Sequence, residues 1–174
     1  MAVLKVLRYG DPALRRRAVP VGEVTPEVRA TIADMTETMY DEVGIGLAAP
    51  QVGIALRLIV VAHEDGRSVQ ALLNPAIVDR GGEATGEEGC LSIPGVFAPV
   101  TRSAWVKIEA QDVNGGPLAI RASGLRARVL QHEIDHLDGV LFIDRVDPVT
   151  RDRIKRRIKK EGLREDASRH AFAL

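Results

Sequence analysis

Two histidines and a glutamate stand at a spacing that suits metal chemistry, in the run His132-Glu133-Ile134-Asp135-His136. On a helix, a separation of four residues places His132 and His136 one turn apart on the same face. Two imidazoles so placed can bind one divalent cation, and Glu133 is positioned to act as a general base toward a water on that cation. The run therefore predicts a metal site. The alternative is an exposed polar helix face that carries two histidines by chance.

A catalytic metal site usually has three protein ligands and one open position, so a third ligand is needed. Downstream of the histidine pair the candidates lie in charged, solvated-looking sequence: Glu161, Glu165 and His170. Upstream stands Cys90, the single cysteine of the chain, which cannot form an internal disulfide. A lone cysteine is more often inert core filling. A histidine pair without a third partner raises the expectation that Cys90 is a ligand, and Glu161 and Glu165 stay open as alternatives.

A third unusual segment consists mostly of small residues, Gly44-Ile45-Gly46-Leu47-Ala48-Ala49-Pro50-Gln51. Small side chains allow another polypeptide to lie against this backbone, and Gln51 then offers an amide donor. Taken alone, the run is explained more simply as a tight turn between a helix and a strand. It is not a phosphate-binding loop, because the Lys and Ser/Thr of that motif are absent.

Sequence periodicity indicates three helices. Thr25-Pro26-Glu27 is typical of a helix start, and apolar residues follow at spacings of four, three and four, namely Val28, Ile32, Met35 and Met39. This helix should end near Gly44. A second helix is expected from about Gly124 to Leu137, with its apolar positions at Leu125, Val129, Leu130, Ile134 and Leu137. A third should follow Asp147-Pro148.

Between the first two helices, the pattern changes to short runs rich in β-formers, namely 57–62, 69–74, 105–111 and 117–122. Apolar and charged residues alternate in 105–111, which predicts a strand with one solvated face. Asn114-Gly115-Gly116 indicates a hairpin, and Pro94 with Gly95 should end the strand that carries Cys90. We therefore expect an α+β fold, with antiparallel or mixed β-sheets around a central helix that carries the histidines, and a C-terminal helix.

Composition narrows the class of protein. The 174 residues suit one domain spanning 1–174, and 24 basic residues balance 24 acidic ones, so the overall charge does not indicate a nucleic-acid or membrane partner. The longest apolar run, 58–62, is far too short to span a membrane, and the first residues lack a secretory pattern. One unpaired cysteine suits a reducing compartment. These features predict a cytoplasmic protein.

The three segments together resemble the peptide deformylase family, whose motifs read G-φ-G-L-A-A-x-Q, E-G-C-L-S and Q-H-E-x-D-H. Here they are residues 44–51, 88–92 and 131–136, in the order and at the spacing of the family. The resemblance extends to the Gly10-Asp11-Pro12-Ala13-Leu14-Arg15 stretch and covers most of residues 1–150. Each motif alone has false positives, whereas a coincidence of all three by chance is very rare.

The resemblance implies a ligand set of Cys90, His132 and His136, with water in the fourth position and Glu133 as the general base. It favours Fe²⁺ as the native ion, and the Cys-His-His set also suits Zn²⁺, Ni²⁺ and Co²⁺. The reaction would hydrolyse the N-formyl group of a nascent chain that begins with formyl-methionine, and would release formate.

The same resemblance assigns the side-chain amide of Gln51 and the backbone N–H of Leu91 to stabilise the oxyanion. The substrate would pair like an added strand and would be lined by three residues, Ile45, Gly46 and Gly89. From its place one turn before His132, we infer separately that Val129 forms a wall of the methionine slot. An arginine that some members carry near position 97 is absent from Gly95-Val96-Phe97.

The region after Asp147-Pro148 carries a basic helix at about 148–165, with seven basic residues in 151–160. Ile154 and Ile158 form a narrow apolar stripe, which indicates a helix docked by one edge. Its basic face is either simply solvated or contacts ribosomal RNA near the exit tunnel, since the family acts on nascent chains.

Two other functions compete with deformylation. One is a metallopeptidase that cuts internal peptide bonds, and the missing downstream ligand argues against it. The other is a structural Cys-His-His metal site in a basic RNA-binding module. Structural sites usually have four protein ligands, and the sequence offers no evident fourth one.

Overall fold

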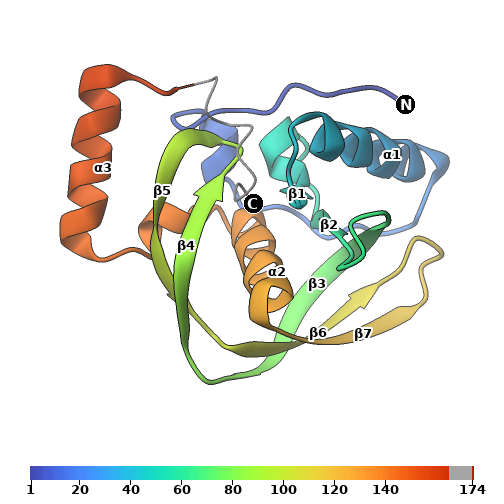
Figure 1. The fold of residues 1–174 in the computed structure, drawn as a ribbon. Coiled ribbons are helices and arrows are strands. Elements are labelled where there is room, and N and C mark those ends of the chain that lie inside the picture. Colours follow the sequence, from blue (N-terminus) through green and yellow to red (C-terminus); the bar gives the residue numbers. More distant parts are fainter. Residues whose placement is uncertain (165–173) are drawn as a thin grey trace.

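The computed structural model describes residues 1–164 and 174. Within these residues, seven strands form two antiparallel sheets (Figure 1). The larger sheet has the order β1-β2-β3-β6-β7, formed by Gly46–Ala48, Leu58–Ala62, Val69–Gly81, Trp105–Gln111 and Pro117–Ser123. The smaller sheet is a hairpin of β4 (Ala84–Cys90) and β5 (Ile93–Arg102).

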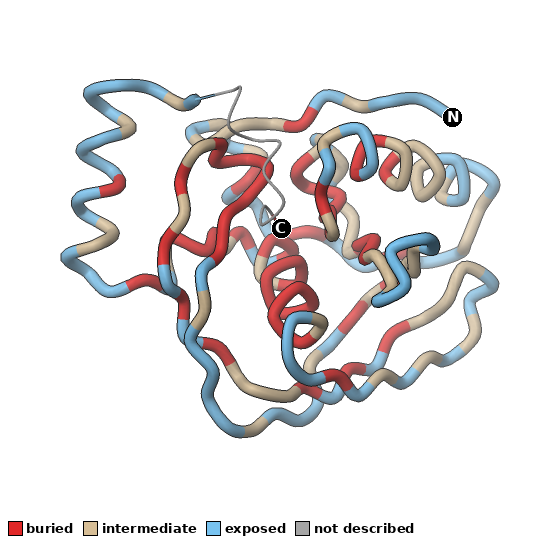
Figure 2. The backbone as a smooth tube through the Cα atoms, viewed as in Figure 1, coloured by how far each residue is buried: buried red, intermediate tan, exposed pale blue. Residues whose placement is uncertain are grey.

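Three α-helices accompany the sheets, namely α1 (Pro26–Asp41), α2 (Gly124–Leu137) and α3 (Pro148–Glu161). Helix α2 lies between the β4–β5 hairpin and the larger sheet (Figure 1). Ten of its 14 residues are buried, so almost its whole circumference faces protein (Figure 2). A helix enclosed in this way holds its side chains in fixed positions, which suits a helix that carries a site.

The expected helices and hairpin are confirmed, with one difference in the core. Helix α1 begins at Pro26, and the Oγ1 of Thr25 accepts a hydrogen bond from the N–H of Val28 at 3.2 Å. Strands β6 and β7 pair across the expected turn, with Gln111 opposite Pro117. The sheet pairs between named strands are all antiparallel. Leu125, which we expected in the core, is 64% exposed.

The expectation that Pro94 and Gly95 end a strand is wrong. Strand β5 starts at Ile93 and runs through both residues to Arg102. The proline is tolerated because the register of the β4–β5 pair shifts between Gly89 and Cys90, so Pro94 lies at an irregularity of the ladder. Strand β3 likewise continues past Asn74, where the register with β6 shifts, to Gly81.

The basic helix is shorter than expected. Helix α3 ends at Glu161, followed by Gly162 at a φ of 73°, rather than near residue 165, which lies outside the described residues. It docks by one edge, as expected, because Ile154 is buried and Ile158 packs against the same apolar cluster. No helix in the described part of the chain is both long and apolar enough to cross a membrane.

Candidate metal centre

Cys90 and the two histidines of α2 converge on one point in the protein interior. The ligand atoms of Cys90, His132 and His136 all lie within 4.8 Å of one another, and the Sγ of Cys90 is 3.5 Å from the Nε2 of His136. Each residue is at most 2% exposed. The Nε2 of His132 has no hydrogen-bond partner among the described residues. A buried ring nitrogen without a partner is costly, and a divalent cation would satisfy it, so this donor set fits a metal.

Gly89, the residue before Cys90, has a neighbour that leaves no room for a side chain. Strand β4 places Gly89 opposite Phe97 of β5, and the phenyl ring lies across the glycine backbone. A Cβ atom at Gly89 would come within 2.5 Å of that ring. Glycine therefore allows Phe97 to cover the strand immediately before the cysteine ligand.

The orientation of His132 is fixed by Glu88. The Oε1 of Glu88 lies 2.9 Å from the Nδ1 of His132, which turns the opposite ring nitrogen toward Cys90 and His136. Arg102 and Arg128 donate hydrogen bonds to the Oε2 of Glu88, both at 2.6 Å. Burial alone would raise the pKa of Glu88, but hydrogen bonds from His132 and Arg102 hold it well below its usual range. Glu88 is therefore ionised and anchors the imidazole.

Glu88 belongs to the second motif, but the sequence did not predict a role for it. Its partners are remote, since Arg102 lies 14 residues away and Arg128 lies 40 residues away. The only local signal was an acidic residue two positions before a cysteine. A buried carboxylate needs cationic partners, and no local pattern indicated which arginines would supply them.

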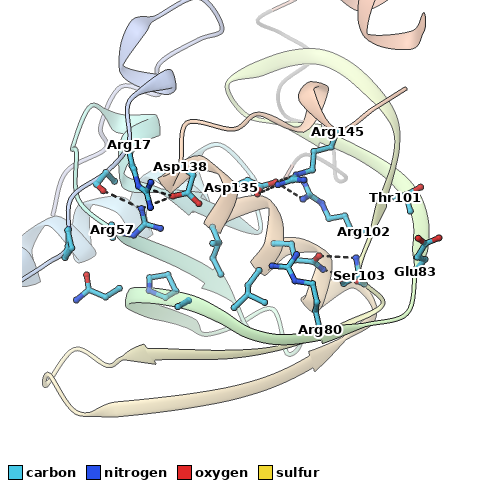
Figure 3. A pocket seen from close by; sticks show the side chains of 18 of the residues that line it. Arg17, Arg57, Arg80, Glu83, Thr101, Arg102, Ser103, Asp135, Asp138 and Arg145 are labelled. Carbon is cyan, nitrogen blue, oxygen red and sulfur yellow. Dashed lines mark hydrogen bonds and ion pairs between the residues drawn. The ribbon is translucent and has the colours of Figure 1, made fainter. Parts of the chain in front are cut away.

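Asp135 connects this ion-pair network to the surface. Arg102 donates to the Oδ2 of Asp135 at 2.8 Å, and Arg145 donates to the same oxygen at 2.6 Å. These three residues line a polar pocket of about 820 Å³ beside α2 (Figure 3). None of the three metal-ligand candidates lines that pocket. Asp135, between the two histidines in sequence, thus secures the helix rather than the ion.

We expect Glu88→Gln to weaken the metal centre and the fold together. Among the described residues, loss of the carboxylate leaves the buried Arg128 without a carboxylate partner and Arg102 with Asp135 alone, which costs about 3–5 kcal/mol. Loss of the anchor on His132 should lower metal affinity by about 10–100-fold. Urea unfolding and metal titration measure the two effects, with Glu87→Gln on the same strand as a matched control. A Glu88→Gln protein with wild-type metal affinity would contradict this role.

Glu133 lies beside the histidines with its carboxylate in an enclosed space. The residue is fully buried, and neither carboxylate oxygen has a hydrogen-bond partner among the described residues. Burial raises the pKa of Glu133 to about 7. A Cβ atom at Gly46 would lie 2.6 Å from its Oε2, so the carboxylate occupies the space left by a missing side chain. Gly46, which we expected to line the substrate, therefore makes room for Glu133.

We expect Gly46→Ala to lower kcat by about 100-fold, because a methyl group at this position must displace the Glu133 carboxylate and a shift of about 1 Å in a catalytic group has that cost. Metal content should not change, since the three atoms nearest the added Cβ all belong to Glu133, which is not one of the converging ligands. Gly22→Ala provides the control, because a Cβ atom there meets no other atom within 4 Å. Equal kcat values for the two variants would contradict the steric argument.

Gln51 and Leu91, which the resemblance assigns to the oxyanion, both lie next to Cys90. The Oε1 of Gln51 accepts a hydrogen bond from the N–H of Ala48 at 3.0 Å, which fixes the amide. Its Nε2 donates to the Oγ of Ser92 at 3.1 Å and lies 3.6 Å from the Sγ of Cys90. The N–H of Leu91 points away from the β4–β5 ladder, toward residue 174.

The two remaining sequence candidates also lie close to α2. Val129 is buried in the apolar cluster that surrounds this helix, and Ile45 packs against the same cluster. The backbone oxygen of Ile45 accepts a hydrogen bond from Ala62, so this residue extends the β1 edge of the larger sheet.

Comparisons with known proteins agree with this geometry. Residues 3–152 match the family model described as polypeptide deformylase. The peptide deformylase of Alkalilimnicola ehrlichii is 49% identical, and the match covers 92% of this chain and 91% of that protein. The peptide deformylase of Tolumonas auensis is 47% identical, and the match covers 95% of this chain and 99% of that protein. The crystal structure of the Legionella pneumophila enzyme superposes with a TM-score of 0.86 at 43% identity, covering 91% of this chain and 95% of that one. The chain belongs to the peptide deformylase family.

Proposed function

We propose that this protein removes the N-formyl group from the N-terminal methionine of newly synthesised chains, releasing formate, at the centre formed by Cys90, His132 and His136. The observation that carries this proposal is the convergence of these three ligands beside a fully buried, unpaired Glu133 carboxylate. A divalent cation held there supplies Lewis-acid activation of a water molecule and of the formyl carbonyl.

Glu133 is proposed to move the protons of the reaction. Its carboxylate accepts a proton from the attacking water and later gives one to the leaving amine. A pKa raised to about 7 by burial suits both transfers near neutral pH. The enclosed position between Gly46 and the histidines keeps the carboxylate close to the ligands and away from bulk solvent.

Two donors are proposed to stabilise the negative charge that develops on the formyl oxygen. They are the Nε2 of Gln51, which already lies 3.6 Å from the cysteine sulfur, and the backbone N–H of Leu91, the residue after that cysteine. Both are held by the fold before substrate arrives, and such preorganised donors cost no reorganisation during the reaction.

The substrate is proposed to lie as an added strand along the edge of β4 that faces away from β5. Among the described strands β4 pairs only with β5, and the backbone groups of Gly89 and Leu91 on the other edge can pair with a peptide. Ile45 and Val129, both part of the apolar environment of α2, would contact the methionine side chain, and Gly46 would lie near the formyl end.

The native ion is proposed to be Fe²⁺. A Cys-His-His donor set accommodates Fe²⁺, Zn²⁺, Ni²⁺ and Co²⁺, and the family resemblance favours iron. Protein purified without oxygen should contain iron, and reconstitution with each ion should give the highest kcat with Fe²⁺. Equal activity of the zinc and iron forms would overturn this choice of metal.

The test of the function is release of formate from formyl-Met-Ala, compared with acetyl-Met-Ala and with cleavage of a peptide blocked at both ends. We expect formate release from the first substrate, with little turnover of the other two. Cleavage of the blocked peptide would indicate the metallopeptidase alternative. Metal binding without turnover of any substrate would indicate a structural metal site.

We further propose that the exposed face of α3 contacts ribosomal RNA. This contact and a nascent-chain substrate would both place the protein in the cytoplasm. The basic residues at 155, 156, 159 and 160 are exposed, while Arg157 donates to the backbone oxygen of Gly95 at 3.0 Å and helps to dock the helix. Surface lysines that are not needed for docking are thus available for phosphate contacts.

We expect the double variant Lys155→Glu/Lys159→Glu to cosediment with ribosomes less than wild type, and the salt dependence of binding to flatten by about one unit per lost phosphate contact. Formate release from a short peptide should not change. Lys5→Glu/Lys107→Glu, two exposed positions outside α3, is the charge-matched control. Unchanged cosedimentation of the α3 variant would rule out this contact.

A further inference from the structure

Leu174 lies on the same strand edge at which the substrate is proposed to bind. Its backbone N–H donates to the carbonyl oxygen of Gly89 at 3.1 Å, and its own oxygen accepts a hydrogen bond from the N–H of Leu91 at 3.3 Å. The two bonds lie on either side of Cys90, which is how a residue on a parallel neighbouring strand pairs with an edge. Leu174 thus uses the backbone groups that an added substrate strand would need.

The side chain of Leu174 fills apolar space next to α2. It is 2% exposed and belongs to the cluster that includes Val129, Leu130 and Ile134, against which Ile45 also packs. Figure 1 places this end of the chain beside α2. Leucine and methionine have similar volumes and exchange readily in apolar sites. A leucine here therefore takes the place proposed for the methionine side chain of the substrate.

The site is closed while Leu174 occupies it. Cys90, His132, Glu133 and His136 are each at most 2% exposed, and Gln51 is fully buried. In addition, the N–H of Leu91, one of the two proposed oxyanion donors, already has an acceptor. A polypeptide substrate cannot make the proposed contacts until Leu174 has left.

We propose that Leu174 is an intramolecular competitor that occupies the substrate edge of β4 and the methionine slot, and so limits access of formylated chains to the metal centre. This inference rests on the proposed function for the identity of the site. It goes beyond the family match, because Leu174 lies outside the residues 3–152 that match the family model.

Intramolecular competition has a defined kinetic signature. Suppose that only a fraction f of the protein molecules is in the state that can bind a ligand. The apparent Kd for that ligand is then higher than the intrinsic Kd by a factor of 1/f. A site closed about nine-tenths of the time would therefore show a KM about tenfold higher than an open one. The kcat would not change, because saturating substrate excludes the competitor. A residue that only stabilises the fold would not produce this combination.

The test compares Leu174→Asp and Leu174→Ala with wild type in the full-length protein. An aspartate should not enter the apolar slot, so we expect a KM for formyl-Met-Ala about tenfold lower, with kcat unchanged, and a smaller decrease for alanine. Val149→Asp, at a position that is 67% exposed, is the control for the same kind of change elsewhere. Unchanged KM in both Leu174 variants would overturn the proposal. No formate release from any of the proteins would instead contradict the proposed function.

Two further measurements separate competition from simple anchoring. A synthetic peptide with the sequence of residues 169–174 should inhibit the Leu174→Asp protein competitively, while the same peptide ending in aspartate should not. Amide hydrogen exchange at Leu91 should accelerate in Leu174→Asp, because its N–H loses an acceptor. A lower Tm with wild-type KM and no inhibition by the peptide would show that Leu174 only anchors the chain end.

Discussion

Replacing Glu133 with glutamine is expected to lower kcat by about 10²–10⁴-fold, the usual contribution of a general acid or base. Glutamine keeps the size of the side chain, so it should fit the space beside Gly46 without moving the histidines. It cannot accept a proton from water, and the step assigned to the buried carboxylate is lost. Formate release under saturating formyl-Met-Ala measures the effect.

The companion measurement is metal content. Glu133 is not one of the three converging ligands, so the variant should retain its ion while losing turnover. Glu109→Gln, on the exposed face of β6, makes the same chemical change far from the centre and should retain full activity. If Glu133→Gln were fully active, the centre would be a structural metal site and the assigned role of this residue would be wrong.

Replacing Cys90 with alanine is expected to abolish both metal binding and activity. The remaining two histidines provide too few ligands for a stable site with one open position. Metal analysis after gel filtration should show a content close to zero, and formate release should fall below detection. If Cys90 were inert core filling, the variant would instead retain its metal and lose only a little stability.

The control for lost packing is Val100→Ala, which truncates another buried residue of the β4–β5 hairpin. Both variants should unfold cooperatively, and circular dichroism should show that the fold is retained. Only the Cys90 variant should lose its ion. Restoration of metal binding by Cys90→Asp, a carboxylate ligand, would support a ligand role for the side chain at this position.

The elements that bring the ligands together could be predicted to a large extent, because their signals are local. The helix that carries the histidines was predicted from the periodicity of its apolar residues. The four-residue spacing of the two histidines also indicated a helix, because only a helix places both on one face where they can bind the same ion. The pairing of β6 with β7 followed from one Asn-Gly turn. The histidine pair was recognised from its spacing, the resemblance implied Cys90 as the third ligand, and the structure brings Cys90, His132 and His136 together.

What could not be predicted depends on contacts between distant parts of the chain. Pro94 was expected to end a strand, because local rules penalise proline and do not foresee a shift in register. The partners of Glu88 are two arginines remote in sequence. The contact between Gly46 and the Glu133 carboxylate was not foreseen, because that carboxylate comes from another element. The position of Leu174 was not anticipated, because the region after α3 has no periodicity.

The metal centre takes one ligand from a hairpin and two from a helix, and Cys90 and His136 are 46 residues apart in the chain. An ion bound at this point therefore acts as a cross-link that closes a long loop of the chain. Such a cross-link reduces the conformational entropy of the unfolded chain. Its binding energy contributes to folding energy as well as to chemistry. Cells short of the ion would then hold a protein that is not only inactive but also more readily unfolded, so supply of the metal would set how long each molecule survives.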